Sequence, residues 1–477
     1  MMKKFRLLSL ILALLMILTM FAGCGNKDTD GGKTDTGKGE QVESTYDELP
    51  EGLKAEKIGS IDLDDISTNG DGGLYYRDEN GKYGIMTLDG KKDTGAKYTS
   101  CEPLENYFQV MTVDTNSITD AASLNCIGVV DATGKEIVPL KYASIKVLNE
   151  RYIRVCEVTE QTTNKDEALV YYTDKVFSIS ASDGDTLFKG NWYVYDVTTG
   201  KTLEGVTGTQ AYQISVYGNF VQYVTDAEEQ VTVNDKGEKL PEDADLFDNG
   251  YYALVKDNAG AVYDSNNKKV FDYALDGFVP TDSEGDYILA AQYGDTRKYV
   301  LMDLTGKVVS GEFTDMPTVY GDLIHAGDKV YDLKGNVVIE GTFKNVYFDE
   351  QLGNAWFLKN DEDYTLIKKD GTVLYQGTED DTLVFDAYSN FSIKKKVDDK
   401  NMYYSLADKD FTLEGSSLAP WLVQITKPNY IYDIADAISG KTIISGYQDY
   451  AYVAVPGSMI YVYAQKADGG IDVYTVK

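Results

Sequence analysis

Histidine and cysteine are scarce in this sequence of 477 residues, which has one histidine, His325, and four cysteines. Catalytic triads and zinc centres depend on these side chains, so the composition argues against both. The sequence also contains no Gly-x-Ser-x-Gly elbow and no phosphate-binding P-loop. We interpret His325 as a partly buried strand residue and expect a protein that is not an enzyme.

Basic residues are also in deficit, with 45 Lys and Arg against 77 Asp and Glu and a formal net charge of -32. A surface this acidic repels nucleic acids, so no nucleic-acid partner is expected. Most of these acids are interpreted as solubilising charges. A carboxylate-dependent polysaccharide-degrading enzyme stays open as an alternative. That chemistry needs two acids across one pocket, and the sequence does not select a pair.

Several acidic clusters raise calcium as a further alternative, because Ca²⁺ prefers oxygen ligands. The clusters lie at residues 62–65, 69–72, 183–185, 361–363 and 379–381. None has the complete ligand spacing of a calcium loop. We interpret them as solvated turns and predict neither a metal site nor a cofactor.

Long apolar runs are absent except at the N-terminus. A basic start containing Lys3 and Lys4 precedes an apolar run over residues 7–21, which ends in small residues before Cys24. This pattern predicts a secretory signal peptide over residues 1–23. Residues 21–24, Phe-Ala-Gly-Cys, resemble the lipobox of bacterial lipoproteins, with Phe in place of the usual Leu. The resemblance implies that Cys24 is lipidated and anchors the chain to the extracytoplasmic face of the cell membrane.

Residues 24–46 contain few large apolar side chains and cannot bury enough surface to offset the entropy of ordering. They are predicted to form a flexible polar linker that reaches roughly 25 Å. After lipidation of Cys24, three cysteines remain: Cys101, Cys126 and Cys156. Either one disulfide forms, with Cys101 and Cys126 closest in sequence, or all three are small buried hydrophobes.

A repeated hairpin pattern fills the rest of the chain. Strand-forming residues precede an Asp, a short polar turn with Gly, often a Lys, and further β-branched residues, as in the segments 128–138 and 299–309. Asp accepts main-chain hydrogen bonds at the start of such a turn, and Gly supplies the positive φ that returns the chain. In the copy at Asp264, Asn267 replaces the glycine, and weaker copies centre on Gly90, Gly237, Gly371 and Gly440.

The copies recur about every forty residues, with room for four short strands in each period. This period is the size of a β-propeller blade, so residues 47–477 are predicted to form an all-β, propeller-like repeat domain. An open β-solenoid or two smaller propellers are the alternatives, and a division near 160–190 would mark an insertion. The final hairpin, residues 459–463 and 471–476, lacks a cap and is predicted to share a sheet with an early strand near residues 58–63. No strand is expected to exceed about eight residues, and strict helical periodicity appears nowhere after residue 47.

Residues 81–91 and 127–142 resemble the bacterial WG-containing repeat, although Tyr83 and Ile127 stand in place of its tryptophan. The resemblance implies a β-rich, often exported protein, and it carries no catalytic or binding residues. Trp192, Trp356 and Trp421 are too far apart in sequence to indicate one binding face. We therefore expect a membrane-tethered interaction protein with a protein, peptide or glycan partner, or alternatively a structural lipoprotein of envelope assembly.

Overall fold

A computed structural model describes the protein from residue 52 to residue 477, apart from position 71 and short segments within the chain. These segments are 115–119, 166–167, 169, 174–175, 179–185, 209–213, 226, 257–258, 321–322, 341–344, 350–354, 360–363, 369–372, 377–381, 386–390, 398–399, 405–411, 420, 449–450 and 455–458. The described residues belong to one compact unit, Tyr46–Lys477. Cys24, the signal segment 1–23 and most of the polar linker 24–46 lie outside that unit and outside the described residues. Among the helices of the described part, none has the length and apolarity needed to cross a bilayer.

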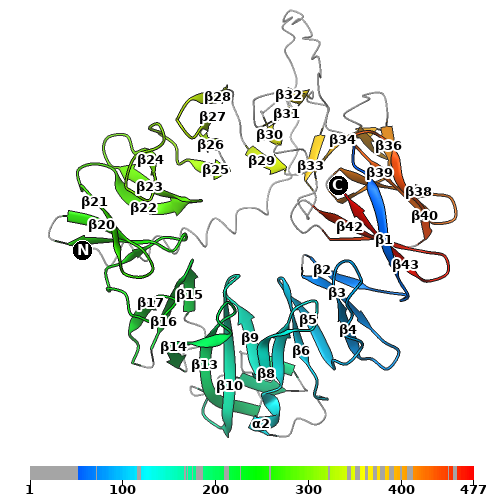
Figure 1. The fold of residues 1–477 in the computed structure, drawn as a ribbon, viewed down its shortest axis with the longest axis horizontal. Coiled ribbons are helices and arrows are strands. Elements are labelled where there is room, and N and C mark those ends of the chain that lie inside the picture. Colours follow the sequence, from blue (N-terminus) through cyan, green and yellow to red (C-terminus); the bar gives the residue numbers. More distant parts are fainter. Residues whose placement is uncertain are drawn as a thin grey trace, which may run out of the picture. The chain divides into compact units, whose positions relative to one another are not determined.

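The described strands form eleven small antiparallel sheets, seven of them with four strands (Figure 1). Six of these seven are built from consecutive strands: β5 (Ser100–Leu104), β6 (Tyr107–Met111), β7 (Ile127–Val130) and β8 (Glu136–Tyr142); β18 (Asp245–Leu246), β19 (Tyr252–Lys256), β20 (Ala259–Tyr263) and β21 (Lys269–Tyr273); β25 (Thr318–Tyr320), β26 (Leu323–Ala326), β27 (Lys329–Asp332) and β28 (Val337–Glu340); β29 (Asn345–Asp349), β30 (Ala355–Lys359), β31 (Tyr364–Lys368) and β32 (Val373–Gln376); β33 (Thr382–Phe385), β34 (Phe391–Val397), β35 (Lys400–Tyr404) and β36 (Thr412–Glu414); β37 (Ser416–Ala419), β38 (Leu422–Lys427), β39 (Ile431–Asp436) and β40 (Thr442–Gln448).

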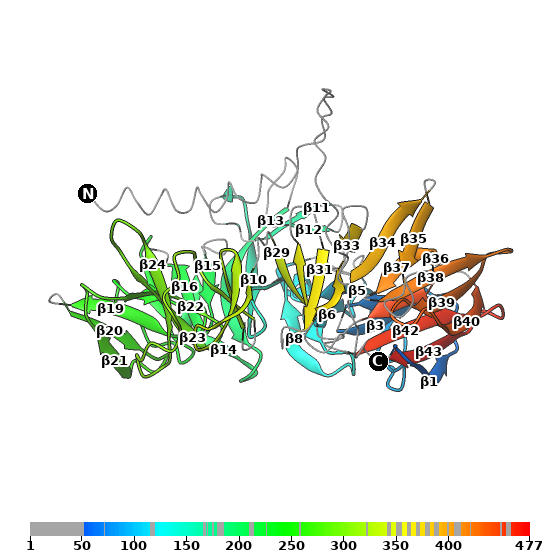
Figure 2. The same cartoon turned by 90° about the horizontal axis from the view of Figure 1, so that it is seen from above.

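The seventh four-stranded sheet joins the two ends of the repeat region. It consists of β41 (Ala451–Ala454), β42 (Ile460–Gln465), β43 (Ile471–Val476) and, at its edge, β1 (Ala55–Ile61). Ala55 pairs with Val476 and Ile61 with Ile471, and both views show the blue β1 beside the red β43 (Figures 1 and 2). The predicted sharing of a sheet between the C-terminal hairpin and an early strand is therefore confirmed. A first strand that completes the last sheet is the arrangement of a closed propeller-like repeat, not of an open solenoid.

Three further sheets have three strands: β2 (Ser67–Asn69), β3 (Gly73–Arg77) and β4 (Tyr83–Met86); β15 (Ile214–Tyr217), β16 (Phe220–Val224) and β17 (Gln230–Val233); β22 (Val279–Glu284), β23 (Tyr287–Gln292) and β24 (Lys298–Met302). In each of them isolated bridges mark the place of the fourth strand, as between Tyr299 and Phe313 and between Val233 and Lys239. The four-stranded period predicted from the sequence is therefore kept, with an irregular outer strand in these sheets.

The turns between the third and fourth strands have the chemistry that the sequence predicts. In the β7–β8 turn, Asp131 Oδ1 accepts hydrogen bonds from the main-chain N–H groups of Thr133 (2.8 Å) and Lys135 (3.0 Å). Gly134 has φ +77°, and Asn267 adopts φ +60° where it replaces the glycine. The same geometry recurs in the turns that begin at Asp264, Asp303 and Asp332. The copy at Gly371 lies outside the described residues.

The remaining sheet contains the insertion that the irregular spacing predicts near residues 160–190. Its strands are β9 (Ser144–Val147), β10 (Tyr152–Thr162), β11 (Val170–Thr173), β12 (Val176–Ser178), β13 (Thr186–Asp196) and β14 (Lys201–Gly208). The expected limit of eight residues per strand is wrong here, because β10 and β13 each have 11 residues. The described residues also include a single helical turn, α2 (Ala121–Leu124), capped by Asp120, which is too short to show a helical period in the sequence.

The core consists of a series of clusters, most of which lie between neighbouring sheets. Trp192 and Val194 of β13 pack with Val221 and Tyr223 of β16, and the ring centroids of Trp192 and Tyr223 are 5.8 Å apart. Tyrosine fills many of these contacts, and several of its side chains are fully buried: Tyr142, Tyr152, Tyr252 and Tyr463. Such burial is what allows small sheets with two apolar faces to be stable side by side.

Candidate functional site

One end of the sheets carries two kinds of turn, and we call this end the turn face. It contains the hairpins between first and second strands and the Asp–Gly turns between third and fourth strands, which an antiparallel meander places together. Turns of neighbouring sheets are bonded to one another across this face. Asn69 Nδ2 donates to the Tyr107 carbonyl oxygen (2.6 Å), and Asn234 Nδ2 donates to that of Ser265 (2.9 Å).

Arg151 fixes a third junction of the turn face. Its guanidinium donates two hydrogen bonds to Asp196 Oδ2 (3.2 and 2.8 Å), one to Asn219 Oδ1 (2.9 Å) and one to Asp235 Oδ2 (3.2 Å). Asp196 is buried, which by itself would raise its pKa, but hydrogen bonds from Arg151 and Thr198 more than offset burial and hold that pKa below its usual value. Four turns of two sheets are thus held by one arginine.

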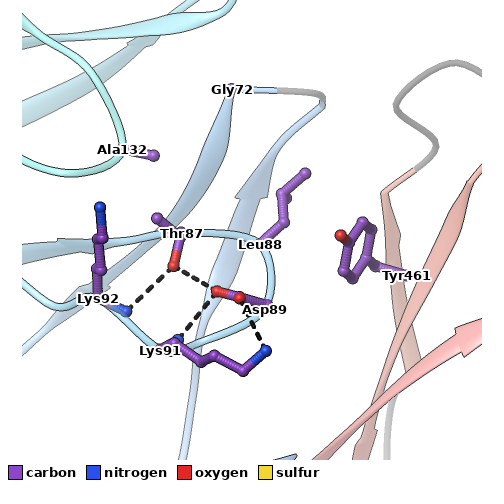
Figure 3. A pocket seen from close by; sticks show the side chains of 8 residues that line it. All are labelled: Gly72, Thr87, Leu88, Asp89, Lys91, Lys92, Ala132 and Tyr461. Atoms are coloured by element: carbon purple, nitrogen blue, oxygen red, sulfur yellow. Dashed lines mark hydrogen bonds and ion pairs between the residues drawn. The ribbon is translucent and has the colours of Figure 1, made fainter. Parts of the chain in front are cut away.

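A hollow of about 400 Å³ opens on the turn face where three sheets meet (Figure 3). This volume is within the usual range for small-molecule sites. The hollow is lined by Gly72, Thr87, Leu88, Asp89, Lys91, Lys92, Ala132 and Tyr461. Tyr461 comes from β42 and the others come from turns that follow β2, β4 and β7, so the wall depends on the closure of the first sheets against the last.

A glycine allows two of these turns to pack closely against each other. Gly73 has φ +134°, and a Cβ there would lie 2.7 Å from Ala132 Cβ. Tyr463, fully buried on β42, donates its hydroxyl to the Leu88 carbonyl oxygen (2.8 Å) and so fixes the turn to the last sheet. Burial raises the pKa of Tyr463, and this hydroxyl therefore stays a donor at neutral pH.

The polar groups at the base of the hollow are largely engaged with one another. Thr87 Oγ1 donates to Asp89 Oδ1 (2.6 Å), which also accepts from the main-chain N–H of Lys91 (3.1 Å), and the Lys91 ammonium lies 3.2 Å from Asp89 Oδ2. Burial raises the pKa of Asp89, but these bonds from Thr87 and Lys91 outweigh it and leave the pKa below its usual value. Asp89 is therefore a carboxylate whose charge is neutralised by Lys91.

Lys92 differs from Lys91. Its main-chain N–H donates to Thr87 Oγ1 (3.1 Å), but its ammonium forms no ion pair with any residue that the structure describes. Figure 3 shows the side chain extending on the Ala132 side of the hollow, with the Tyr461 ring on the opposite side next to Leu88 and Asp89. The hollow thus offers one uncompensated cation and one aromatic ring.

This group of residues was not predicted from the sequence. The doubled lysine after Gly90 is not a distinguishing signal, because the copy of the turn at Asp264 also carries two adjacent lysines, Lys268 and Lys269. Tyr461, moreover, lies more than 300 residues away from Lys92, and only the pairing of β1 with β43 brings the two segments together.

The residues singled out from the sequence have mainly structural positions. Cys101, Cys126 and Cys156 are buried and unpaired, so the interpretation as small hydrophobes is confirmed and the disulfide is not formed. Burial raises the pKa of Cys101 to about 12 and that of Cys156 to about 11, which makes both thiols unreactive. His325 lies half-buried on β26, as expected.

The acidic clusters give no metal centre in the part of the chain with described coordinates. There, no three His, Cys, Asp or Glu side chains are grouped to hold a metal ion. Asp62, Asp64 and Asp65 are exposed, and Asn69 serves the junction with Tyr107. Residues 183–185, 361–363 and 379–381 lie outside the described residues. Trp192 and Trp421 are fully buried, while for Trp356 only the strand position on β30 is described.

Comparison with known proteins agrees with the repeat. Residues 127–157 match the family model of the WG containing repeat. No curated protein matches the chain. Similar solved structures include the computationally designed Ika8 protein (14% identity, 55% of this chain and 95% of that one, TM-score 0.21). They also include BamB from Moraxella catarrhalis, with 10% identity, 55% of this chain and 92% of that one covered, and a TM-score of 0.22. A eukaryotic initiation factor has 11% identity, 68% of this chain and 95% of that one covered, and a TM-score of 0.32.

At such TM-scores these likenesses carry no argument about function. The fold assignment comes from the strand order of this chain, in which small antiparallel meanders follow one another and β1 completes the last of them. The protein is an all-β, propeller-like scaffold that contains a WG repeat.

Proposed function

We propose that this chain is a lipoprotein, held on the extracytoplasmic face of the cell membrane through Cys24, whose repeat body binds a partner at the turn face. The signal segment 1–23 and the residues around Cys24 support the anchor. The proposal assigns no reaction to the body, because the sequence offers one histidine and no nucleophile motif.

The observation that carries the binding role is the construction of the turn face. Its turns are bonded from sheet to sheet by Asn69, Asn234 and Arg151, so they form a preorganised surface and not a set of independent loops. Preorganised groups lose little entropy when a partner binds. The hollow with Lys92 and Tyr461 opens on this same face.

The first residues of the body that the structure describes lie at the turn face. Lys54 and Lys477 exchange two main-chain hydrogen bonds (3.0 and 3.2 Å) beside the paired ends of β1 and β43. At this position other sheets have an Asp–Gly turn that links their third and fourth strands. A lipid-anchored chain of this design presents its turn face within reach of the envelope layer next to the membrane. We therefore place the partner in that layer.

Two measurements test the proposal in cells. Metabolic labelling with an alkyne-bearing palmitate should label the full chain and recover it with membranes, whereas Cys24→Ala should lose both the label and the membrane retention. A photoreactive diazirine residue at exposed Lys135, on the turn face, should cross-link one constant partner. The same residue at exposed Thr296, in the β23–β24 hairpin at the other end of its sheet, is the matched control. Equal or absent cross-linking from the two positions would contradict the binding role.

A further inference from the structure

The groups of the hollow that are left free indicate what it can bind. Thr87, Asp89 and Lys91 use most of their hydrogen-bonding capacity on one another. The Lys92 ammonium and the Tyr461 hydroxyl have no partner among the described residues, and Leu88 and Ala132 add apolar surface. A ligand that fits needs an anionic group for Lys92 and a flat, weakly polar face for Tyr461 and Leu88.

Asp89 adds a second requirement. Its carboxylate oxygens lie on the wall between Lys92 and Tyr461 and can accept further hydrogen bonds from hydroxyl groups (Figure 3). A sugar ring supplies hydroxyl donors on its edge and an apolar C–H face that stacks on an aromatic ring. An acidic peptide side chain supplies a carboxylate for Lys92 but no hydroxyl donors for Asp89.

The net charge of the chain limits the ligand further. With a formal charge of -32, the body repels densely charged polyanions over about 8 Å at physiological salt. An isolated carboxylate that binds Lys92 directly is repelled less than a polymer that carries an acidic group on every unit. A single acidic sugar unit meets the three requirements together.

We infer that the hollow formed by Thr87, Asp89, Lys92 and Tyr461 is a binding site for a sugar acid, a saccharide unit that carries a carboxylate. The carboxylate pairs with the Lys92 ammonium, the ring hydroxyls donate to Asp89, and the ring face lies on Tyr461. The inference rests on the proposed binding role of the turn face and names the ligand class for it.

Glucuronate and glucose form a matched pair of probes, because they differ only in a carboxylate against a hydroxymethyl group. Their binding to the full chain, purified in detergent, is measured by saturation-transfer NMR titration. Glucuronate should bind about fivefold more tightly than glucose, the size of one partly screened ion pair. Lys92→Gln should remove this preference, and Tyr461→Leu should weaken both sugars.

Lys268→Gln is the control, because Lys268 is exposed like Lys92 but lies in the Asp264 turn, outside the hollow. It should keep the preference for glucuronate, and thermal unfolding should show that the lysine variants remain folded. Equal binding of the two sugars, binding of neither, or a preference that survives Lys92→Gln would overturn the inference. Competition by N-acetylglutamate amide as strong as by glucuronate would assign the hollow to acidic peptides instead.

The result of the sugar titration can be distinguished from the results that test the proposed function. Constant cross-linking from position 135 together with no sugar preference would reject the sugar acid alone. Loss of cross-linking and of membrane retention would reject the binding lipoprotein whatever the sugars do.

Discussion

Lys57 on the first strand and Asp472 on the last form an ion pair with 2.7 Å between Nζ and Oδ2, while Ser60 Oγ donates to Asp472 Oδ1 (2.7 Å). The pair lies across the β1–β43 junction that closes the repeat region. Burial raises the pKa of Asp472, but the bonds from Lys57 and Ser60 hold it below its usual value. One strand at the edge of a sheet thus joins the two ends of the repeat region.

A disulfide across this junction should stabilise the fold. Glu56 and Thr475 are paired in register, so the variant Glu56→Cys/Thr475→Cys places two thiols on opposite strands. Oxidation closes a loop of nearly the whole domain and should raise the free energy of unfolding by about 3 kcal/mol. The measurement is urea unfolding of the oxidised and reduced forms, with Glu56→Cys alone as the control. Identical midpoints for the two forms would mean that this junction does not hold the body closed.

The Asp–Gly turns predict a difference between two glycine substitutions. Gly134 and Gly95 both have positive φ, +77° and +67°, but a Cβ at Gly134 would lie 2.6 Å from Thr94 Cγ2, whereas a Cβ at Gly95 has nothing within 4 Å. Gly95→Ala should cost about 1 kcal/mol for the left-handed backbone alone. Gly134→Ala should cost about 2 kcal/mol, because Thr94 must also move. Chemical denaturation of both variants measures the difference in the free energy of unfolding. Equal losses of stability would contradict the predicted clash between a Cβ at position 134 and Thr94.

These turns explain how much of the fold the sequence could predict. Asp131, Gly134 and their counterparts act within five residues, so the hairpin and its period are visible in the sequence. The closing strand was predictable for another local reason, since the final hairpin has no polar edge of its own.

Long-range effects were not predictable. The second half of β10, Glu157 to Thr162, is polar enough to read as a loop, yet pairing with β13 keeps it extended past a bulge at Val158/Glu160. The hollow could not be predicted either, because Lys92 and Tyr461 become neighbours only after β1 has joined β43. Both depend on contacts between residues that are far apart in sequence.

Arg151 should be one of the most sensitive positions on the turn face. Arg151→Met leaves the buried carboxylate of Asp196 without its cation, at a cost of about 3 kcal/mol. Asp196→Asn in the same chain should recover part of this loss, because the uncompensated charge is then gone. Arg77→Met is the control, since Arg77 is exposed and, among the described residues, its side chain bonds only to the Gly81 carbonyl oxygen at 3.3 Å, beside the Tyr83 ring. Urea unfolding of these three variants and of Asp196→Asn alone gives the coupling energy between Arg151 and Asp196, and a loss of stability at Arg151 no larger than at Arg77 would contradict the prediction.

His325 provides a pH dependence that one substitution can isolate, because the chain has no other histidine. Burial lowers the pKa of His325 below its ordinary 6.5, although a hydrogen bond with the Gly327 main chain partly opposes it, and Nε2 is buried without a partner among the described residues. Below pH 6.5 the unfolded chain binds a proton that the folded chain resists, so stability should fall as the pH decreases from 6.5 towards the folded pKa. Above pH 7 this contribution should be constant. Urea midpoints between pH 5.5 and 7.5 measure the slope, and His325→Gln should flatten it. The imidazole resonance of the folded chain gives the pKa directly, and a value at or above 6.5 would show that the side chain is solvated.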